Sequence, residues 1–186
     1  KILEGKRIST ETATKDYLQD FNQISMLLQD QLSYDDWIEL YLKLVHWDLE
    51  LAAPKENNLL QSLNDQKKEA NKEFSKYVER HYKSWINSSS REDRPKLTVE
   101  IVKDYVFPLV SEAKGPTFFF VLDCLRLDQW MTMEKHLRDY FKISKDYYYS
   151  ILPTATSYAR NALFAGLYPS DIEKNYPDLW TNNDED

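Results

Sequence analysis

The apolar run at residues 117–122 (Thr-Phe-Phe-Phe-Val-Leu) constrains the fold of this chain more than any other stretch. It is short, carries apolar side chains at consecutive positions and stops abruptly at Asp123. Such a run suits a strand in a sheet that is covered on both faces. Open α/β sheets place their ligand groups at the carboxyl ends of the strands. The run therefore predicts a buried strand with Asp123 at a ligand-binding edge.

A second stretch, residues 151–169, indicates the end of a strand, a turn at Pro153 and Thr154, and a helix over residues 158–165. A hydroxyl at the start of a helix lies beside unpaired backbone N–H groups and the positive end of the helix dipole, which together favour an anion. A carboxylate and a hydroxyl brought together in this way indicate a metal-assisted site that acts on phosphate or a similar anion. The hypothesis requires Asp123 and a threonine of this stretch to lie close together.

The residue pattern alone leaves alternatives open at these positions. Asp123 is either a metal ligand, which would compensate a carboxylate at the end of a buried strand, or a cap of the following turn. Thr154 and Thr156 compete for the role of nucleophile, and N-capping is the alternative for each of them. Asn161 is either a donor to a phosphate oxygen or a packing or capping partner.

Three residues that follow Asp123 have expected roles of their own. Arg126 and Asp128 are predicted to form an ion pair that orients the loop after Asp123. Cys124 is predicted to be a small buried residue, because free cysteines are among the most buried residue types. As the single cysteine of the chain it excludes an internal disulfide and indicates a reducing compartment.

Residues 121–130, 152–162 and 166–169 resemble the start of a PglZ domain, a member of the alkaline phosphatase superfamily. Pro-Thr-Ala-Thr at residues 153–156, with a later Gly-Leu-Tyr-Pro, also resembles the nucleophile segment of nucleotide pyrophosphatase/phosphodiesterases. The resemblance implies that Asp123 is a metal ligand and that Thr156, the second threonine, is both nucleophile and metal ligand. Substrate contacts are expected from Ser157 and Asn161. Second-tier candidates are Arg126, Asp128, Thr154 and Arg160.

The helical part up to residue 86 extends the resemblance to PorX-type response regulators of the type IX secretion system, in which a receiver domain precedes a helical segment and a PglZ domain. This implies a two-component regulator with a zinc-dependent phosphodiesterase-like effector domain that holds a pair of zinc ions when complete. The remaining Asp and His ligands are expected from later in such a chain, so the 186 residues alone are expected to lack the metal and to be inactive. The alternative is a signalling module without catalysis, in which the bundle mediates phosphorylation-dependent dimerisation and partner binding.

The same resemblance implies the partners. A histidine kinase would act through a receiver domain that lies outside these residues, and the chain would form a homodimer. A sigma factor or a component of the secretion system would bind the regulator, and an oligonucleotide would be its substrate. The expected location is the cytoplasm without membrane insertion, because no apolar run is long enough to span a bilayer and no signal peptide opens the chain.

Hydrophobic periodicity predicts amphipathic helices over residues 12–32, 35–53 and 59–82, with Ser33 capping the second and Pro54 ending it. We expect them to form an antiparallel three-helix bundle. The polar stretch at residues 87–95 is the predicted linker. The domain prediction is a helical bundle over residues 1–90 and the N-terminal portion of a PglZ-type domain over residues 91–186.

The second half is expected to alternate strands and helices. A short helix capped by Thr98 is predicted over residues 99–106, a crossover helix over residues 127–140 and a second strand over residues 143–152. The predicted fold class is therefore α plus α/β, with the bundle followed by part of an alkaline-phosphatase-like domain that has a mostly parallel sheet.

Charge and histidine placement limit the function classes. The net charge of −7 argues against a nonspecific nucleic-acid binder. His46, His81 and His136 do not share a metal-ligand spacing. The first residue is not methionine and the last residues are acidic, so we expect the chain to be a piece of a longer protein.

Overall fold

The computed structural model describes residues 2–51 and 57–180, and it divides into two compact units. Unit 1 joins the residues up to Ser89 with Arg126–Lys142, and unit 2 joins Ser90–Leu125 with the residues from Ile143 onward. The helical elements in chain order are α1 (Ile2–Leu27), α2 (Tyr34–Leu51), α3 (Asn57–Asn87), the 3-10 turn η1 (Thr98–Glu100), the π-helical turn η2 (Val102–Val106), α4 (Phe107–Glu112), α5 (Leu127–Leu137), α6 (Thr156–Ala165), α7 (Pro169–Asn175) and the 3-10 turn η3 (Pro177–Leu179).

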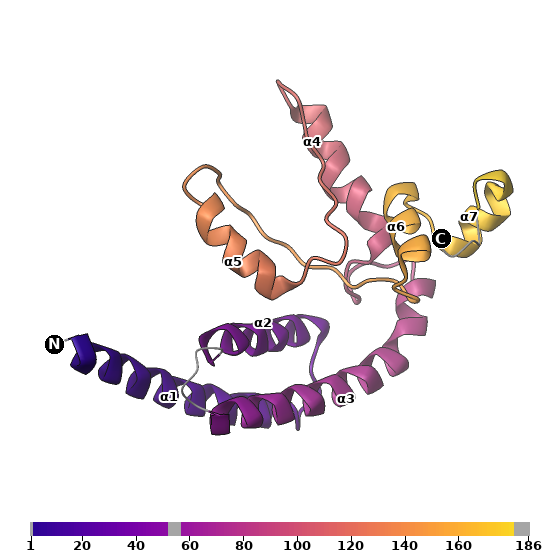
Figure 1. Ribbon diagram of the computed structural model, residues 1–186. Coiled ribbons are helices and arrows are strands. Elements are labelled where there is room, and N and C mark those ends of the chain that lie inside the picture. The colour runs from indigo at the N-terminus through magenta and orange to yellow at the C-terminus, as the bar shows by residue number, and fades with distance from the viewer. Residues whose placement is uncertain (1, 52–56, 181–186) are drawn as a thin grey trace. The chain divides into compact units, whose positions relative to one another are not determined.

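Helices α1, α2 and α3 pack on one another in unit 1, with α2 running opposite to the other two (Figure 1). Ser33 starts α2 as predicted: its hydroxyl accepts the Asp36 N–H at 3.2 Å, and the Asp36 carboxylate accepts the Ser33 N–H at 2.8 Å. This reciprocal pair satisfies two backbone donors that a helix start leaves open. The predicted end of α2 at Pro54 lies outside the described residues. Helix α5 also belongs to this unit and contacts α2.

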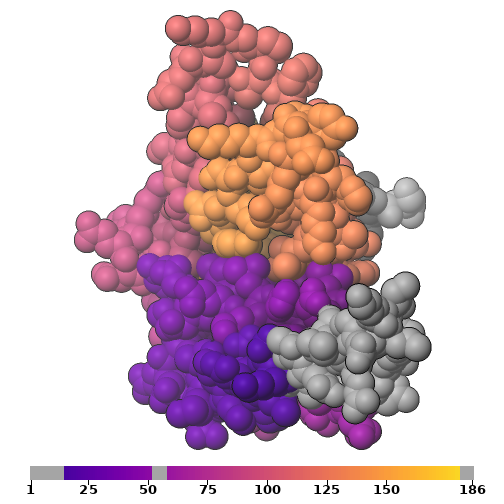
Figure 2. Space-filling view, turned by 90° about the vertical axis from the view of Figure 1, so that its left-hand side faces the viewer, coloured from indigo at the N-terminus to yellow at the C-terminus, as the bar shows by residue number. Residues whose placement is uncertain are grey.

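The core of unit 1 consists of side chains that recur at helical spacing. Tyr17, Ile24, Leu40 and Leu63 are almost completely buried. Each such side chain stabilises the fold by roughly 1.5–3 kcal/mol relative to an exposed position. Gln66 is a buried polar residue of this core: its side-chain amide donates to the Phe21 carbonyl of α1 at 2.8 Å, which fixes α3 against α1. Figure 2 shows the side chains of α2 and α3, in violet and purple, packed closely together.

Unit 2 is built around the contact between α6 and η1. Its buried hydrophobic side chains include Leu97, Ile151, Ala162, Leu163 and Ile172. Gly166 ends α6 with a φ of +63°, a left-handed conformation that glycine adopts at little cost. In the part of the chain that the structure describes, none of the helices combines the length and apolar character needed to cross a bilayer.

The predicted mostly parallel sheet is wrong. Among residues 2–51 and 57–180 no strand is formed, and backbone pairing of the sheet type is confined to one parallel bridge between Leu97 and Tyr149. Residues 117–122 are exposed, with Phe118 at 74% and Phe120 at 79% of full exposure. A strand needs a neighbour whose N–H and C=O groups pair with its own, and a buried parallel strand needs cover on both faces. The described residues supply neither to this run, so its apolar composition alone does not make it a strand.

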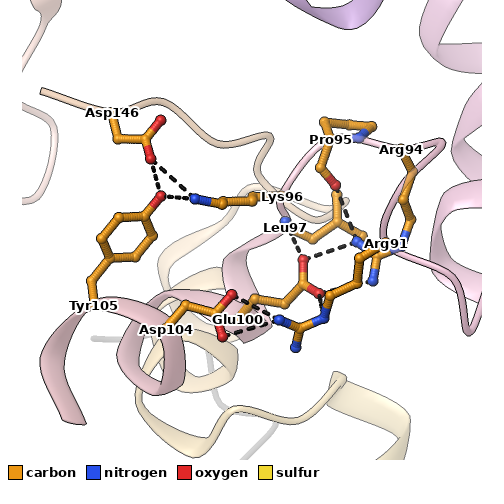
Figure 3. Close-up of polar contacts among 9 residues, drawn as sticks. All are labelled: Arg91, Arg94, Pro95, Lys96, Leu97, Glu100, Asp104, Tyr105 and Asp146. Atoms are coloured by element: carbon orange, nitrogen blue, oxygen red, sulfur yellow. Dashed lines mark hydrogen bonds and ion pairs between the residues drawn. The ribbon is translucent and has the colours of Figure 1, made fainter. Parts of the chain in front are cut away.

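A buried ion pair fixes the segment that leads into η1. The Arg94 guanidinium donates to both carboxylate oxygens of Glu100, at 2.9 and 2.8 Å, and only 8% and 6% of the two side chains are exposed. Glu100 also accepts the Leu97 N–H at 2.9 Å and pairs with Arg91 at 2.8 Å. Figure 3 shows these donors around the Glu100 carboxylate. The hydrogen-bonding capacity of this carboxylate is therefore satisfied although the side chain is buried.

We expect this carboxylate to make unit 2 sensitive to acid. Burial alone would raise the pKa of Glu100, but the Arg94 hydrogen bonds, the Leu97 N–H and the charges of Arg94 and Arg91 outweigh it and lower the pKa below its ordinary value. A lowered carboxyl pKa adds stability above the ordinary glutamate pKa of about 4.3, and this stability is lost as the pH falls through the lowered value. The difference in unfolding free energy between the wild type and Glu100→Gln should be constant from neutral pH to about pH 5 and shrink below it. A difference that grows on acidification would contradict this.

Candidate functional site

Asp123 and Thr156 lie side by side in unit 2. Thr156 is the first residue of α6, and its hydroxyl donates to the Asp123 carboxylate with 3.2 Å between Oγ1 and Oδ2. The second carboxylate oxygen of Asp123 accepts the Cys124 N–H at 2.8 Å. Asp123 is exposed and Thr156 is half-buried, so both oxygens are within reach of a ligand that approaches from solvent. The structure thus brings together the carboxylate and the hydroxyl on which the sequence hypothesis depends.

The turn after Asp123 has an unusual backbone. Cys124 adopts a φ of +58°, in the left-handed region that is uncommon for residues other than glycine. Such a conformation costs on the order of 1–3 kcal/mol and occurs preferentially at functional sites. Cys124 is exposed, so the prediction that it is buried is wrong. Its backbone, through the N–H that holds the Asp123 carboxylate, is what contributes to the site.

Neither threonine caps α6. The N-cap of this helix is Ala155, and no side chain makes the capping hydrogen bond. Thr156 instead directs its hydroxyl to Asp123, while Thr154 is exposed in the loop before the helix. The positive end of the α6 dipole therefore lies at the same place as the Asp123–Thr156 pair, an arrangement that favours an anion.

The remaining predicted site residues fall into two groups. Ser157, Arg160 and Asn161 follow Thr156 along the first turns of α6, where Ser157 and Asn161 are half-buried and Arg160 is exposed. Arg126 and Asp128 belong to unit 1 and pair with each other at 2.7 Å, at the start of α5. This is the ion pair that the sequence predicted. Its position shows that it orients the beginning of α5, directly after the Asp123 turn.

Two oxygens suit part of a metal site. Zinc accepts carboxylate oxygens, and its sites are almost always four-coordinate. The Asp123 and Thr156 oxygens are close enough to bind one cation together, and threonine becomes a ligand when it loses its proton. Within the described residues no cluster of three or more His, Cys, Asp or Glu side chains is arranged to hold a metal. The residues present therefore fit a portion of a zinc site, and the described chain does not supply the other ligands.

Comparison with protein families gives two matches along the chain. Residues 7–86 match the PorX response regulator linker domain, and residues 101–185 match the BREX system PglZ alkaline phosphatase-like domain. The chain matches a PorX-type protein with a PglZ domain. No curated protein matches it. Asp123 and Thr156 both fall in the PglZ match, and an alkaline phosphatase-like domain suggests metal dependence.

One residue of unit 2 was assigned a different role by the sequence. Thr98 was predicted to cap a short helix, but its hydroxyl accepts the buried Ile151 N–H at 3.0 Å, across more than 50 residues of chain. Periodicity and motif spacing carry no signal for such a contact, because they describe neighbours in sequence.

Proposed function

We propose that this chain is part of a two-component response regulator of type IX secretion whose PglZ-type domain is a zinc-dependent phosphodiesterase. The observation that supports the activity is the 3.2 Å contact between the Thr156 hydroxyl and the Asp123 carboxylate at the start of α6. A nucleophile, an anionic metal ligand and the positive end of a helix dipole coincide there, and phosphoryl transfer uses these three features.

The chemistry follows from these residues in two steps. The Thr156 oxygen forms a bond to phosphorus while the bond to the leaving alcohol breaks in line with it, and the hydroxyl proton ends on that alcohol. Water then cleaves the phosphothreonine ester and restores the hydroxyl. Asp123 would hold the zinc, and zinc, when bound, lowers the pKa of a coordinated hydroxyl and neutralises charge on the phosphate. The Ser157 N–H and the Asn161 amide donate to the phosphate oxygens that do not react.

The match of residues 7–86 to a response-regulator linker domain favours a second function for the other unit. In this function the α1–α3 bundle mediates phosphorylation-dependent dimerisation, and the regulator binds a sigma factor or a component of the secretion system. This function does not need hydrolysis. It would account for a full-length protein that binds partners and lacks phosphodiesterase activity.

The metal is tested with the full-length protein and the substrate bis(p-nitrophenyl) phosphate. We expect bound zinc by elemental analysis, loss of hydrolysis after chelation and recovery on adding zinc. Asp123→Asn should lower the hydrolysis rate by on the order of 100-fold or more, because it removes a charged ligand. Asp128→Asn is the matched control, since this half-buried aspartate pairs with Arg126 instead. Hydrolysis that survives both complete zinc removal and Asp123→Asn would reject zinc at Asp123. A full-length protein that shows no hydrolysis with zinc bound would reject the enzyme and leave the signalling function.

A further inference from the structure

We propose that η1 sets the position of the Thr156 hydroxyl and that Thr98 is its key positioning residue. The inference deepens the proposed phosphodiesterase function and rests on it for its catalytic consequence. Thr98 is 2% exposed, so a substrate that approaches from solvent does not reach it. Its influence would pass through the chain segment that precedes α6.

Residues 96–98 are joined to residues 149–151 by hydrogen bonds. The Thr98 hydroxyl accepts the Ile151 N–H at 3.0 Å, and the Lys96 carbonyl accepts the Tyr149 N–H at 2.8 Å. Ile151 is 1% exposed, so water cannot replace the Thr98 hydroxyl as the acceptor of its N–H. The chain is therefore fixed at Ile151, and only residues 152–155 separate this point from Thr156.

The turn η1 also contacts the C-terminal end of α6. Helix α6 packs on η1, and at Gly166 an added Cβ would lie 3.4 Å from the Val99 carbonyl oxygen. The chain thus meets η1 just before α6 begins and again where α6 ends. Thr156 lies between these two fixed points, and its hydroxyl reaches Asp123 from there.

The turn η1 is itself fixed by polar contacts. The Glu100 carboxylate joins its own turn to Arg94 and to the Leu97 N–H. A second cluster links the chain around η1 to the residues just before Tyr149. In this cluster Lys96 and Tyr105 both bind the Asp146 carboxylate (Figure 3). The Arg94–Glu100 pair in particular transmits position, because buried ion pairs and hydrogen bonds allow few alternative arrangements, whereas the Lys96–Asp146 pair is exposed.

Thr98→Val tests the proposal in the full-length protein with bis(p-nitrophenyl) phosphate. Valine keeps the shape of threonine but leaves the Ile151 N–H buried without an acceptor, so residues 152–156 are expected to loosen. Because small displacements of reacting groups cost up to about 100-fold in rate, we expect kcat to fall about 10- to 100-fold while KM changes less than about twofold. Hydrogen exchange at residues 152–157 should become faster. Thr98→Ser, which keeps the hydroxyl, should restore both kcat and protection.

The matched control is Thr132→Val, which removes a hydroxyl that donates within α5, to the Asp128 carbonyl. It should leave kcat and exchange at residues 152–157 unchanged. Unchanged kcat in Thr98→Val, in an enzyme that Thr156→Val inactivates, would overturn the positioning role and leave the proposed function intact. If Thr156→Val is itself fully active, Thr156 is not the nucleophile and the proposed mechanism fails. In that case hydrogen exchange at residues 152–157 tests whether Thr98 positions this segment. Unchanged protection in Thr98→Val would overturn the positioning role.

Discussion

Thr156→Val should lower kcat/KM for bis(p-nitrophenyl) phosphate by about 1,000-fold or more in the full-length protein. The substitution removes the oxygen that is to attack phosphorus and that contacts Asp123 at 3.2 Å, while valine keeps the branched shape at the start of α6. Removing a nucleophile commonly costs far more than removing a binding contact, because the remaining groups cannot take over the covalent step. The effect should appear in kcat, with zinc content reduced as well if the threonine oxygen is a ligand.

Two comparisons make this result specific. Thr156→Ser keeps a hydroxyl in the same place and should retain most of the activity. Thr154 was the competing candidate in the sequence, and it is exposed in the loop before α6 without the contact that Thr156 makes with Asp123. If Thr154→Val abolishes hydrolysis and Thr156→Val does not, the nucleophile has been assigned to the wrong threonine.

The helices of unit 1 were predictable because their cause is local. Apolar residues at helical spacing define the faces of α1, α2 and α3, and the Ser33–Asp36 pair marks where α2 begins. Helix ends were less predictable: α3 continues to Asn87, beyond the predicted end at residue 82. The residues that extend it include Trp85, which is 4% exposed, so packing carries the helix past the last clear repeat.

Residue types predicted that Asp123 would lie close to a threonine before the helix, and the family resemblance selected Thr156. The reason given for the contact was a sheet edge, which the described residues do not form. The contact depends instead on the left-handed turn at Cys124 and on the hold of η1 on Ile151. Neither has a sequence pattern, since a positive φ at cysteine and a threonine–amide bond between distant residues are tertiary features. The sequence identified the two groups as candidates, and only the fold shows what brings them together.

Glu100→Ala is expected to lower the unfolding free energy of unit 2 by about 3–5 kcal/mol, since it leaves the Arg94 guanidinium buried with its partner removed. Arg94 is 8% exposed, and among the described residues its Nε already has no hydrogen-bond partner, so little is available to replace the carboxylate. Removing Glu100 also frees the Leu97 N–H that the carboxylate holds. Hydrogen exchange in increasing denaturant, read from peptides of η1 and α6, measures this unit separately from the bundle.

The same loss should not follow from breaking an exposed pair. Asp128→Ala removes the partner of Arg126, whose side chain is 69% exposed and stays hydrated, so exchange in either unit should hardly change. Replacing both buried partners, as in Arg94→Leu with Glu100→Leu, should recover much of the stability lost in Glu100→Ala, because no uncompensated charge is then buried. A double variant as unstable as the single one would show instead that the hydrogen bond from Leu97 to Glu100, more than the ion pair, holds η1 in place.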